Sequence, residues 1–487
     1  MYKKEFESKL RKLTLTLFAF HLRNELTQSD KPEEDANLIW EWCENLGKDL
    51  NIKELEGFKD KLRKHNDEIG LPATQDYPDS DYLELLKEPG LISFSIPNIQ
   101  HQIKGAVYPL QIHDINALDI SLSSTSDAVK LADLNELNPK YFSLPKNIKS
   151  SLKDNFLGQT LLLFAQPVDT IKDYQTLAKE CLEVLVPEIE IKKDFLSSGF
   201  FFGSPIFEYD NGQEEPGKSI HILIWFNSVF VTENLAETNS YYQPLIYLLC
   251  YRSKILFAYS ESRKSYQEAK ELYQTLKETV ESIKKLPKES NERLQKFNNI
   301  LRNLSFQAFD YTRHLRDLEI QNATIETNCK NYKIVLQELQ KISLKDRDNL
   351  QFLQEFLNHA LNKLAEQIKV DLSYLTTGRE LYSEIINSIR GIVEIEQAEL
   401  EAEKIKLNAK KAEHDKSLER TIQVVGVGLG SGAIAAASIS AHIDKPFKPL
   451  NPDHPVHPMV SSLLWSVLAT IAAGLLTWLW TKRNLNN

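Results

Sequence analysis

Two long apolar windows near the C-terminus place the strongest constraint on how this chain can fold. The first covers residues 421–443 and the second covers residues 459–481, and neither contains Asp, Glu, Lys or Arg. A helix needs about 20 predominantly apolar residues to cross the ~30 Å hydrocarbon core of a bilayer. Both windows reach that length, so the sequence predicts two transmembrane helices that form a C-terminal hairpin.

The flanks of the windows predict how the hairpin would be oriented. Trp478 and Trp480, followed by Lys482 and Arg483, are typical of an anchor at a membrane interface. Lys and Arg number six in the 17 residues before the first window and two in the tail 482–487, against two in the Pro-rich loop 444–458. Because positive charge favours the cytoplasmic side, we expect a two-span membrane protein with both termini cytoplasmic.

Small residues dominate the first window. Gly428, Gly430 and Ala433 fit a loose GxGxxA dinucleotide-binding turn, but no strand precedes them and no βαβ pattern surrounds them. Glycines four residues apart also let helices approach closely in lipid, and we favour that reading. The candidate packing or pore-lining residues are Gly426, Gly428, Gly430, Ser431, Gly432 and Ser438.

The rest of the chain divides by its hydrophobic pattern. Residues 1–70 show mixed three- and four-residue spacing of apolar side chains, which predicts a helical N-terminal segment with an amphipathic helix around Leu13 to Phe20. Residues 71–238 contain short β-rich runs and one helical run at Tyr174–Val186, which predict an α/β or α+β domain with a modest sheet.

From residue 239 onward, helical periodicity replaces the strand signals. Residues 239–343 predict a helical coiled-coil region interrupted near Pro287, and residues 344–420 predict one long stalk helix. Ile386, Val393, Leu400 and Leu407 lie seven apart and form one edge of a heptad seam, whereas Glu396, Glu403 and Lys410 occupy the other edge. The expected fold class is therefore mostly α, with an α/β (or α+β) cytosolic domain, a stalk and a transmembrane hairpin.

Composition excludes several functional classes. A formal net charge of −10 and a pI near 5.7 argue against a nucleic-acid binder. The four cysteines, Cys43, Cys181, Cys250 and Cys329, are widely spaced and predict reduced, packed thiols rather than a metal or disulfide site. We find no motif for catalytic, cofactor-binding or metal-ligating residues, and expect no cofactor and no enzymatic activity.

The order of these segments resembles the architecture of CorA-type divalent-cation channels. A large cytosolic part, long helices, two C-terminal spans with a short outer loop and a basic tail follow one another in the same order. The Gly-Met-Asn signature of that family is absent, because Ser440-Ala441-His442-Ile443-Asp444 follows the first window. The resemblance implies a homo-oligomeric pore whose ion it does not identify.

Two functional hypotheses follow. The first is an oligomeric membrane channel or pore in which the cytosolic domain senses an unidentified small-molecule or protein trigger, as a signal-gated membrane effector would. The second is a membrane-anchored coiled-coil scaffold without transport activity. Both assume the lipid bilayer and further copies of the chain as partners.

Overall fold

A computed structural model describes residues 8–22, 38–63, 82–96, 102–137, 155–186, 197–211, 213, 216, 219–229, 232, 240–286 and 290–411. The chain divides into two units, each built from two stretches of sequence. The first unit combines residues 1–276 with residues 307–381, and the second combines residues 277–306 with residues 382–487.

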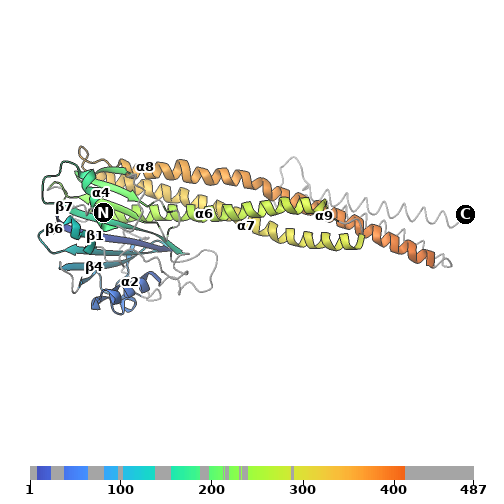
Figure 1. Cartoon of the computed structure of the whole chain (residues 1–487), viewed down its shortest axis with the longest axis horizontal. Helices are drawn as coiled ribbons and strands as arrows, with labels where there is room; N and C mark the ends of the chain where they lie inside the picture. The colour runs from blue at the N-terminus through green and yellow to red at the C-terminus, as the bar shows by residue number, and fades with distance from the viewer. Residues whose placement is uncertain are drawn as a thin grey trace, which may run out of the picture. The chain divides into compact units, whose positions relative to one another are not determined.

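A ten-stranded mixed sheet forms the base of the first unit (Figure 1). Its main path runs β2-β4-β5-β1-β7-β10-β9-β8, with β3 paired to β4 and β6 paired to β1. All of these neighbours are antiparallel except β7 and β10, which are parallel. The strands are β1 (Lys9–Leu22), β2 (Tyr82–Glu84), β3 (Ile92–Ile96), β4 (Ile103–Ile112), β5 (Ile115–Ser124), β6 (Val129–Lys130), β7 (Phe156–Pro167), β8 (Ser197–Phe201), β9 (Ser204–Asp210) and β10 (His221–Phe226).

The central position of β1 corrects the amphipathic helix expected near the N-terminus. Leu13, Leu15 and Leu17 alternate with Thr14 and Thr16, which is the two-residue period of a strand. The leucines are buried in the main apolar core, whereas the threonine hydroxyls lie 2.9 Å from serine hydroxyls of β5. The helical prediction was wrong because β1 pairs with both β5 and β7, and these cross-strand contacts stabilise the extended conformation.

Helices cover both faces of the sheet. The main core lies between one face and three shorter elements: α2 (Leu38–Asp49), the turn η3 (Leu131–Leu137) and α4 (Tyr174–Leu185). Figure 1 shows α2 on one side of the strands and α6 (Tyr242–Ile283) on the other. The helix expected at Tyr174–Val186 is thereby confirmed as α4.

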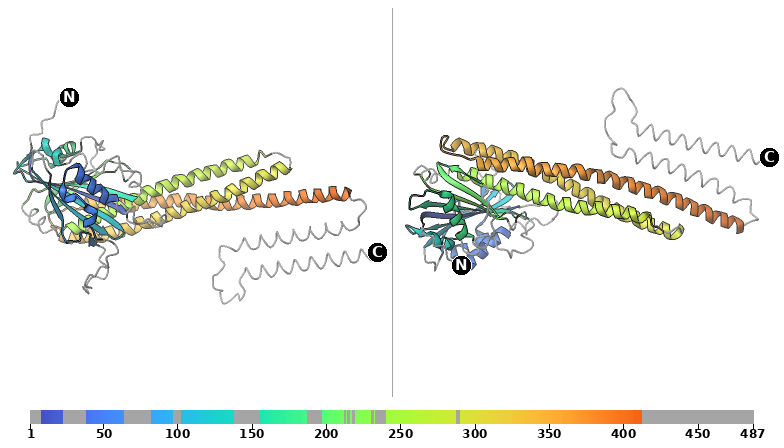
Figure 2. Two further views of the ribbon diagram at one scale, coloured as in Figure 1. Left: turned by 90° about the horizontal axis from the view of Figure 1, so that it is seen from below. Right: turned by 45° about the horizontal axis from the view of Figure 1, so that its top comes forward.

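Three long helical stretches account for most of the remaining described residues: α6, α7 (Ser290–Ile342), and the run from α8 (Gln351–His359) through the π-helical turn η4 (Ala360–Ala365) into α9 (Glu366–Lys411). Helices α6 and α7 confirm the expected interruption near Pro287, since one ends at Ile283 and the next begins at Ser290. Figure 2 lets the reader follow the three stretches, which run alongside one another within the first unit. The third stretch begins later than expected, at Gln351 rather than near Leu344.

Each helical stretch buries a seven-residue repeat. The buried members are Leu248, Ile255, Ser262, Ala269 and Leu276 on α6, Phe297, Leu304, Tyr311, Leu318, Ile325, Tyr332 and Leu339 on α7, and Ile368, Leu375, Tyr382 and Ile389 on α9. This spacing is that of a coiled coil. The seam on α9 leads to Glu396. Of the predicted edge, Val393 is buried, whereas Ile386 and Leu400 are only half-buried.

The loop between α7 and α8 pairs with the outer edge of the sheet. The backbone N–H of Phe200 donates to the carbonyl of Asn349 at 3.0 Å, and the N–H of Asn349 donates back at 2.8 Å. Gly199 makes this approach possible, because a Cβ there would lie 2.1 Å from the Asn349 carbonyl oxygen. The contact covers an edge strand that would otherwise present unpaired backbone groups.

The expected fold class and membrane localisation require correction. The described residues hold a ten-stranded sheet instead of a modest one, and most charged side chains of their long helices are exposed. Within these ranges no helix combines the length and the apolarity that crossing a bilayer requires, which contradicts the transmembrane and ion-channel assignments. The predicted spans 421–443 and 459–481, the loop 444–458 and the tail 482–487 lie outside the described residues.

Candidate functional site

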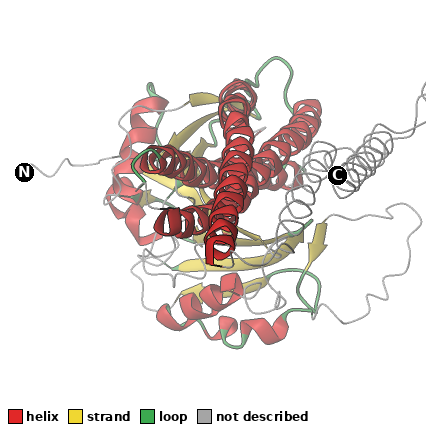
Figure 3. Cartoon of the chain, turned by 90° about the vertical axis from the view of Figure 1, so that its right-hand side faces the viewer, coloured by secondary structure: helices red, strands yellow, loops and turns green. Residues whose placement is uncertain are grey.

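The site residues predicted from the sequence all lie outside the described part of the chain. They are Gly426, Gly428, Gly430, Ser431, Gly432, Ser438, Trp478, Trp480, Lys482 and Arg483. Their arrangement therefore stays a prediction. Figure 3 shows the strands as a layer with the long helices on one of its faces. A group of buried charged side chains lies between this face and α6.

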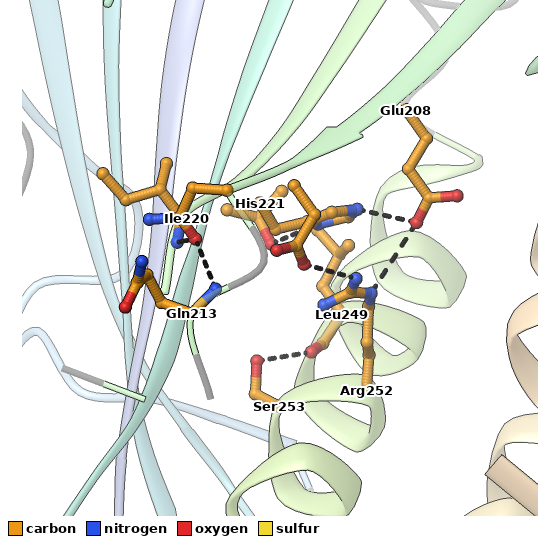
Figure 4. Close-up of polar contacts among 10 residues, drawn as sticks. Glu208, Gln213, Ile220, His221, Leu249, Arg252 and Ser253 are labelled. Atoms are coloured by element: carbon orange, nitrogen blue, oxygen red, sulfur yellow. Dashed lines mark hydrogen bonds and ion pairs between the residues drawn. The ribbon is translucent and has the colours of Figure 1, made fainter. Parts of the chain in front are cut away.

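Strand alternation places this group of buried charges. In β10, Ile222 and Ile224 enter the main core, so His221 and Trp225 point to the opposite face, toward α6. The same two-residue period sends Glu208 and Asp210 of β9 to that face, where Arg252 of α6 meets them (Figure 4). These residues are at most one-tenth exposed, except for a slightly more open Asp210 side chain.

The contacts form one connected network, which we call the His221 cluster. Glu208 Oε1 lies 2.9 Å from His221 Nε2 and 3.7 Å from Arg252 Nε. Arg252 also donates from Nη2 to Asp210 Oδ2 at 3.2 Å, and Thr160 Oγ1 lies 2.9 Å from His221 Nδ1. The cluster therefore joins three adjacent strands, β7, β10 and β9, to one helix.

Charge balance inside the cluster fixes its protonation states. Burial raises the pKa of Glu208, but the hydrogen bond from His221 and the charge of Arg252 act in the opposite direction, and the pKa is lowered below its usual range. Burial, reinforced by the Arg252 charge, lowers the pKa of His221. An ionised Glu208 beside a neutral His221 requires the imidazole to donate from Nε2, so Nδ1 accepts from the Thr160 hydroxyl.

Hydroxyl, imidazole and carboxylate thus stand in the order used to activate a nucleophile. However, Thr160 is 2% exposed, His221 3% and Glu208 7%. Phe356 of α8 further covers the cluster, with its ring centroid 4.9 Å from the Arg252 guanidinium carbon. The ring of Tyr332 of α7 lies 5.5 Å from that of Phe356 and is tilted by 47° against it. Because the hydroxyl is enclosed on all sides by the fold, the geometry suits a link between sheet and helices, not a reacting centre.

A second polar group lies on the same face, near the start of α6. Tyr242 donates to Asp119 at 2.6 Å, and Ser121 donates to the other oxygen of that carboxylate at 3.1 Å. Tyr108 donates to Glu84 at 2.5 Å, and its ring lies 6.2 Å from that of Tyr242. Burial raises the pKa of Asp119 to about 6 despite the two hydrogen bonds it accepts.

Metal chemistry finds no support in the described ranges. Within them, no group of three or more His, Cys, Asp or Glu side chains is placed to hold a metal ion. The four cysteines are free and buried, which confirms the expected packed thiols. Burial raises the pKa of each, to about 12 for Cys250, so all four stay protonated at neutral pH.

The outward surface of α7 carries exposed apolar side chains, although the helix already buries a complete seven-residue repeat on its inner side. Phe309 is 70% exposed, Ile334 55% and Ile320 40%, although the residues facing α6 and α9 are buried. We call these three side chains, together with the exposed bases between them, the outer face of α7. Outward positions of a packed helix are normally polar, so this face has apolar surface left to bury.

The His221 cluster was not predicted from the sequence, in which no motif marks catalytic or metal-ligating residues. The available signal was the alternation of Glu208 and Asp210 with the apolar residues of a strand, which places two acids on one face. That both acids meet a cation from α6 follows only from the folded arrangement.

Comparison with known proteins adds no identity. Neither a scan against protein-family models nor searches of curated proteins and of solved structures finds a match to this chain, so nothing among them identifies a CorA-type architecture.

Proposed function

We propose that this chain is a non-enzymatic interaction protein whose coiled coil associates with further copies of the chain. The sheet would act as a base that fixes the helices, and the outward helix surfaces would carry the association. This retains the scaffold hypothesis without its membrane anchor.

The outer face of α7 is the observation that carries the proposal. Phe309, Ile320 and Ile334 lie on a helix whose inner stripe is already occupied by Tyr311, Leu318 and their repeats. Burying an exposed Phe or Ile side chain contributes about 1.5–3 kcal/mol. Burying three such side chains of one helix would therefore favour association, which a fully polar surface would not do.

The His221 cluster supports the same proposal. It ties α6 to three strands, and Phe356 and Tyr332 extend the contact to α8 and α7. An assembling helix must be held rigidly if its surface is to present a fixed pattern. The enclosure of the Thr160 hydroxyl is the reason we assign this cluster a structural and not a catalytic role.

The proposal is tested by measuring the mass of the full chain with sedimentation velocity over a concentration series. We expect a concentration-dependent oligomer, and we expect the triple variant Phe309→Ser, Ile320→Ser, Ile334→Ser to be monomeric with unchanged circular dichroism. A matched control replaces Leu91 and Val168, which are exposed apolar residues outside the coil, by Ser. A monomeric wild-type chain, or a triple variant that still assembles like the control, would refute the proposal.

A further inference from the structure

Strand β3 has a sequence that reads the same in both directions. Residues 92–96 are Ile-Ser-Phe-Ser-Ile. Phe94 and Ile96 belong to the main core and Ile92 packs against it, whereas Ser93 and Ser95 are exposed. The strand therefore has one apolar and one polar face, and both stay the same when its direction is reversed.

The register of β4 shows which backbone groups of β3 point away from the sheet. Strand β4 pairs with β5 on one side and with β2 and β3 on the other. The N–H of Leu85, just after β2, donates to the carbonyl of Pro109 at 3.1 Å, so every second residue of β4 from Ile103 to Pro109 faces this other side. These residues pair with the three apolar residues of β3. The backbone N–H and C=O groups of Ser93 and Ser95 consequently point outward.

The outer side of β3 is open within the part of the chain that the structure describes, since no strand there pairs with it. By contrast, Phe200 of β8 bridges to Asn349, and Leu86, just after β2, bridges to Leu62. Open edges of natural sheets usually carry a charged side chain, a proline or a bulge, which prevents another strand from adding. Residues 89–103 contain no Asp, Glu, Lys or Arg, β3 contains no proline, and its register with β4 is unbroken.

This edge is also held in its extended form. The ring of Phe94 packs over Gly105 of β4, where a Cβ atom would lie 2.2 Å from the ring. An aromatic ring that covers a glycine on the neighbouring strand fixes the register of the pair. A further strand would therefore meet a preformed edge, which lowers the entropic cost of pairing.

We propose that β3 of one copy pairs antiparallel with β3 of a second copy, around a two-fold axis at Phe94. Ser93 then lies opposite the partner's Ser95, and the outward backbone groups of this pair exchange both of their N–H···O bonds. The serine hydroxyls can meet as those of Thr14 and Ser123 do at 2.9 Å within the sheet. Because the sequence is symmetric, this register places every residue of β3 opposite one of its own kind.

The inference rests on the self-association proposed above and adds a second contact to it. Pairing over five residues is too short to hold two copies together by itself. Copies already joined through their coils have a high effective concentration, at which such a short contact forms. A symmetric contact also occupies the edge completely, so it closes instead of growing into a fibre.

Two double substitutions at the exposed serines test the register in the full chain. Ser93→Lys with Ser95→Lys places lysines opposite each other across the axis, and should raise the dissociation constant from sedimentation at least about tenfold. Ser93→Lys with Ser95→Glu places each new lysine opposite a new glutamate of the second copy, and should keep the dissociation constant within about threefold of wild type. Both variants alter exposed side chains alone, so circular dichroism should be unchanged.

A matched control adds two lysines at exposed positions outside the strands, Val168→Lys with Thr170→Lys, and should leave association unchanged. If the lysine–glutamate variant is as weak as the double-lysine variant, antiparallel pairing with a second copy is refuted. If both variants behave like the control, the edge is not used, while association through α7 stands on its own test. A wild-type chain that is monomeric refutes both proposals. If the triple variant of α7 still assembles but the double-lysine variant does not, the α7 contact is refuted and the pairing of β3 is kept.

Discussion

Gly378 of α9 lies directly against the buried ring of Tyr311 of α7. A Cβ atom at position 378 would stand 2.2 Å from the Tyr311 hydroxyl oxygen and 2.7 Å from Cζ. The hydroxyl needs this position because it donates to the backbone carbonyl of Leu375 at 2.6 Å. The absence of a side chain at Gly378 thus leaves room for the Tyr311 ring between the helices and lets its hydroxyl donate to the Leu375 carbonyl.

The substitution Gly378→Ala should therefore destabilise the fold. Alanine favours a helix over glycine by about 1 kcal/mol, but the fully buried Tyr311 ring would have to move and give up its hydrogen bond. We expect a net loss of about 1–3 kcal/mol in the free energy of unfolding, measured by urea denaturation followed by circular dichroism.

Gly391, on the same helix, is the matched control. A Cβ there meets nothing within 4 Å, so Gly391→Ala should stabilise the chain by about 1 kcal/mol. Adding Tyr311→Phe should recover part of the stability lost in Gly378→Ala, because it removes the hydroxyl that clashes. Equal effects of the two alanine substitutions would contradict the close contact at position 378.

His21 should make the fold less stable as the pH falls. Burial lowers its pKa from 6.5 to about 4, against a smaller opposing contribution from the backbone of Leu22. Between these pH values His21 is protonated in the unfolded chain and neutral in the folded chain. The free energy of unfolding therefore decreases on acidification. Over the whole interval the loss is about 3 kcal/mol.

His21→Phe should flatten this dependence, measured as the urea midpoint from pH 7.5 down to pH 4 (about the interval in which histidine titrates). Some slope should remain, because burial also lowers the pKa of His221. A variant whose midpoint falls as steeply as that of wild type would show that the protonation of His21 does not govern acid stability.

The pH dependence contributed by Asp119 has the opposite sign. Its pKa is raised from 3.8 to about 6 by burial, so the folded chain holds a proton there that the unfolded chain releases. Stability from this group is present below pH 3.8 and is lost as the pH rises through 6, by about 3 kcal/mol in total. Asp119→Asn should consequently be more stable than wild type above pH 7 and close to it near pH 4.

The experiment compares free energies of unfolding of the two proteins at both pH values. Ser123→Ala provides a control on the same strand, because it removes one hydroxyl contact and no charge. A destabilised Asp119→Asn at high pH would mean that the carboxylate's hydrogen bonds to Tyr242 and Ser121 outweigh its burial.

Elements that depend on contacts between residues close in the sequence were predicted, whereas those that depend on distant partners were not. Helices α6 and α7 follow from local apolar spacing and the interruption near Pro287, and they were predicted correctly. The strand at Lys9–Leu22 was not, because its fate depends on partners more than 90 residues away in β5 and β7. A short run such as LTLTLFAF supports either period until such partners are known.

The heptad seam of α9 shows the same limit at the level of single side chains. Glu396 counted against the seam in the sequence, because a carboxylate is unexpected at an inner position. In the folded second unit Arg293 lies 3.0 Å from it, and the Arg293 guanidinium also stacks on Phe297. A compensating partner about 100 residues earlier on another helix cannot be read from local periodicity. The candidate site escaped prediction for the same reason, since Glu208, His221 and Arg252 come from three separate elements.

The His221 cluster yields the sharpest test of how sheet and helices are joined. Arg252→Met would leave Glu208 and Asp210 buried beside each other without their cation, which should cost about 3–5 kcal/mol of unfolding free energy. The matched control Arg379→Met, at an exposed position of α9, should change the free energy of unfolding by less than about 0.5 kcal/mol. Glu208→Gln should destabilise the fold less than Arg252→Met, because an amide oxygen can still accept from His221 Nε2 without carrying a charge.

The double variant with both substitutions should be destabilised by clearly less than the sum of the two separate losses. Glu208→Gln removes the carboxylate charge that Arg252→Met leaves unpaired. Additive losses in this double-mutant cycle would mean that Arg252 contributes through its packing on Phe356 and not through Glu208.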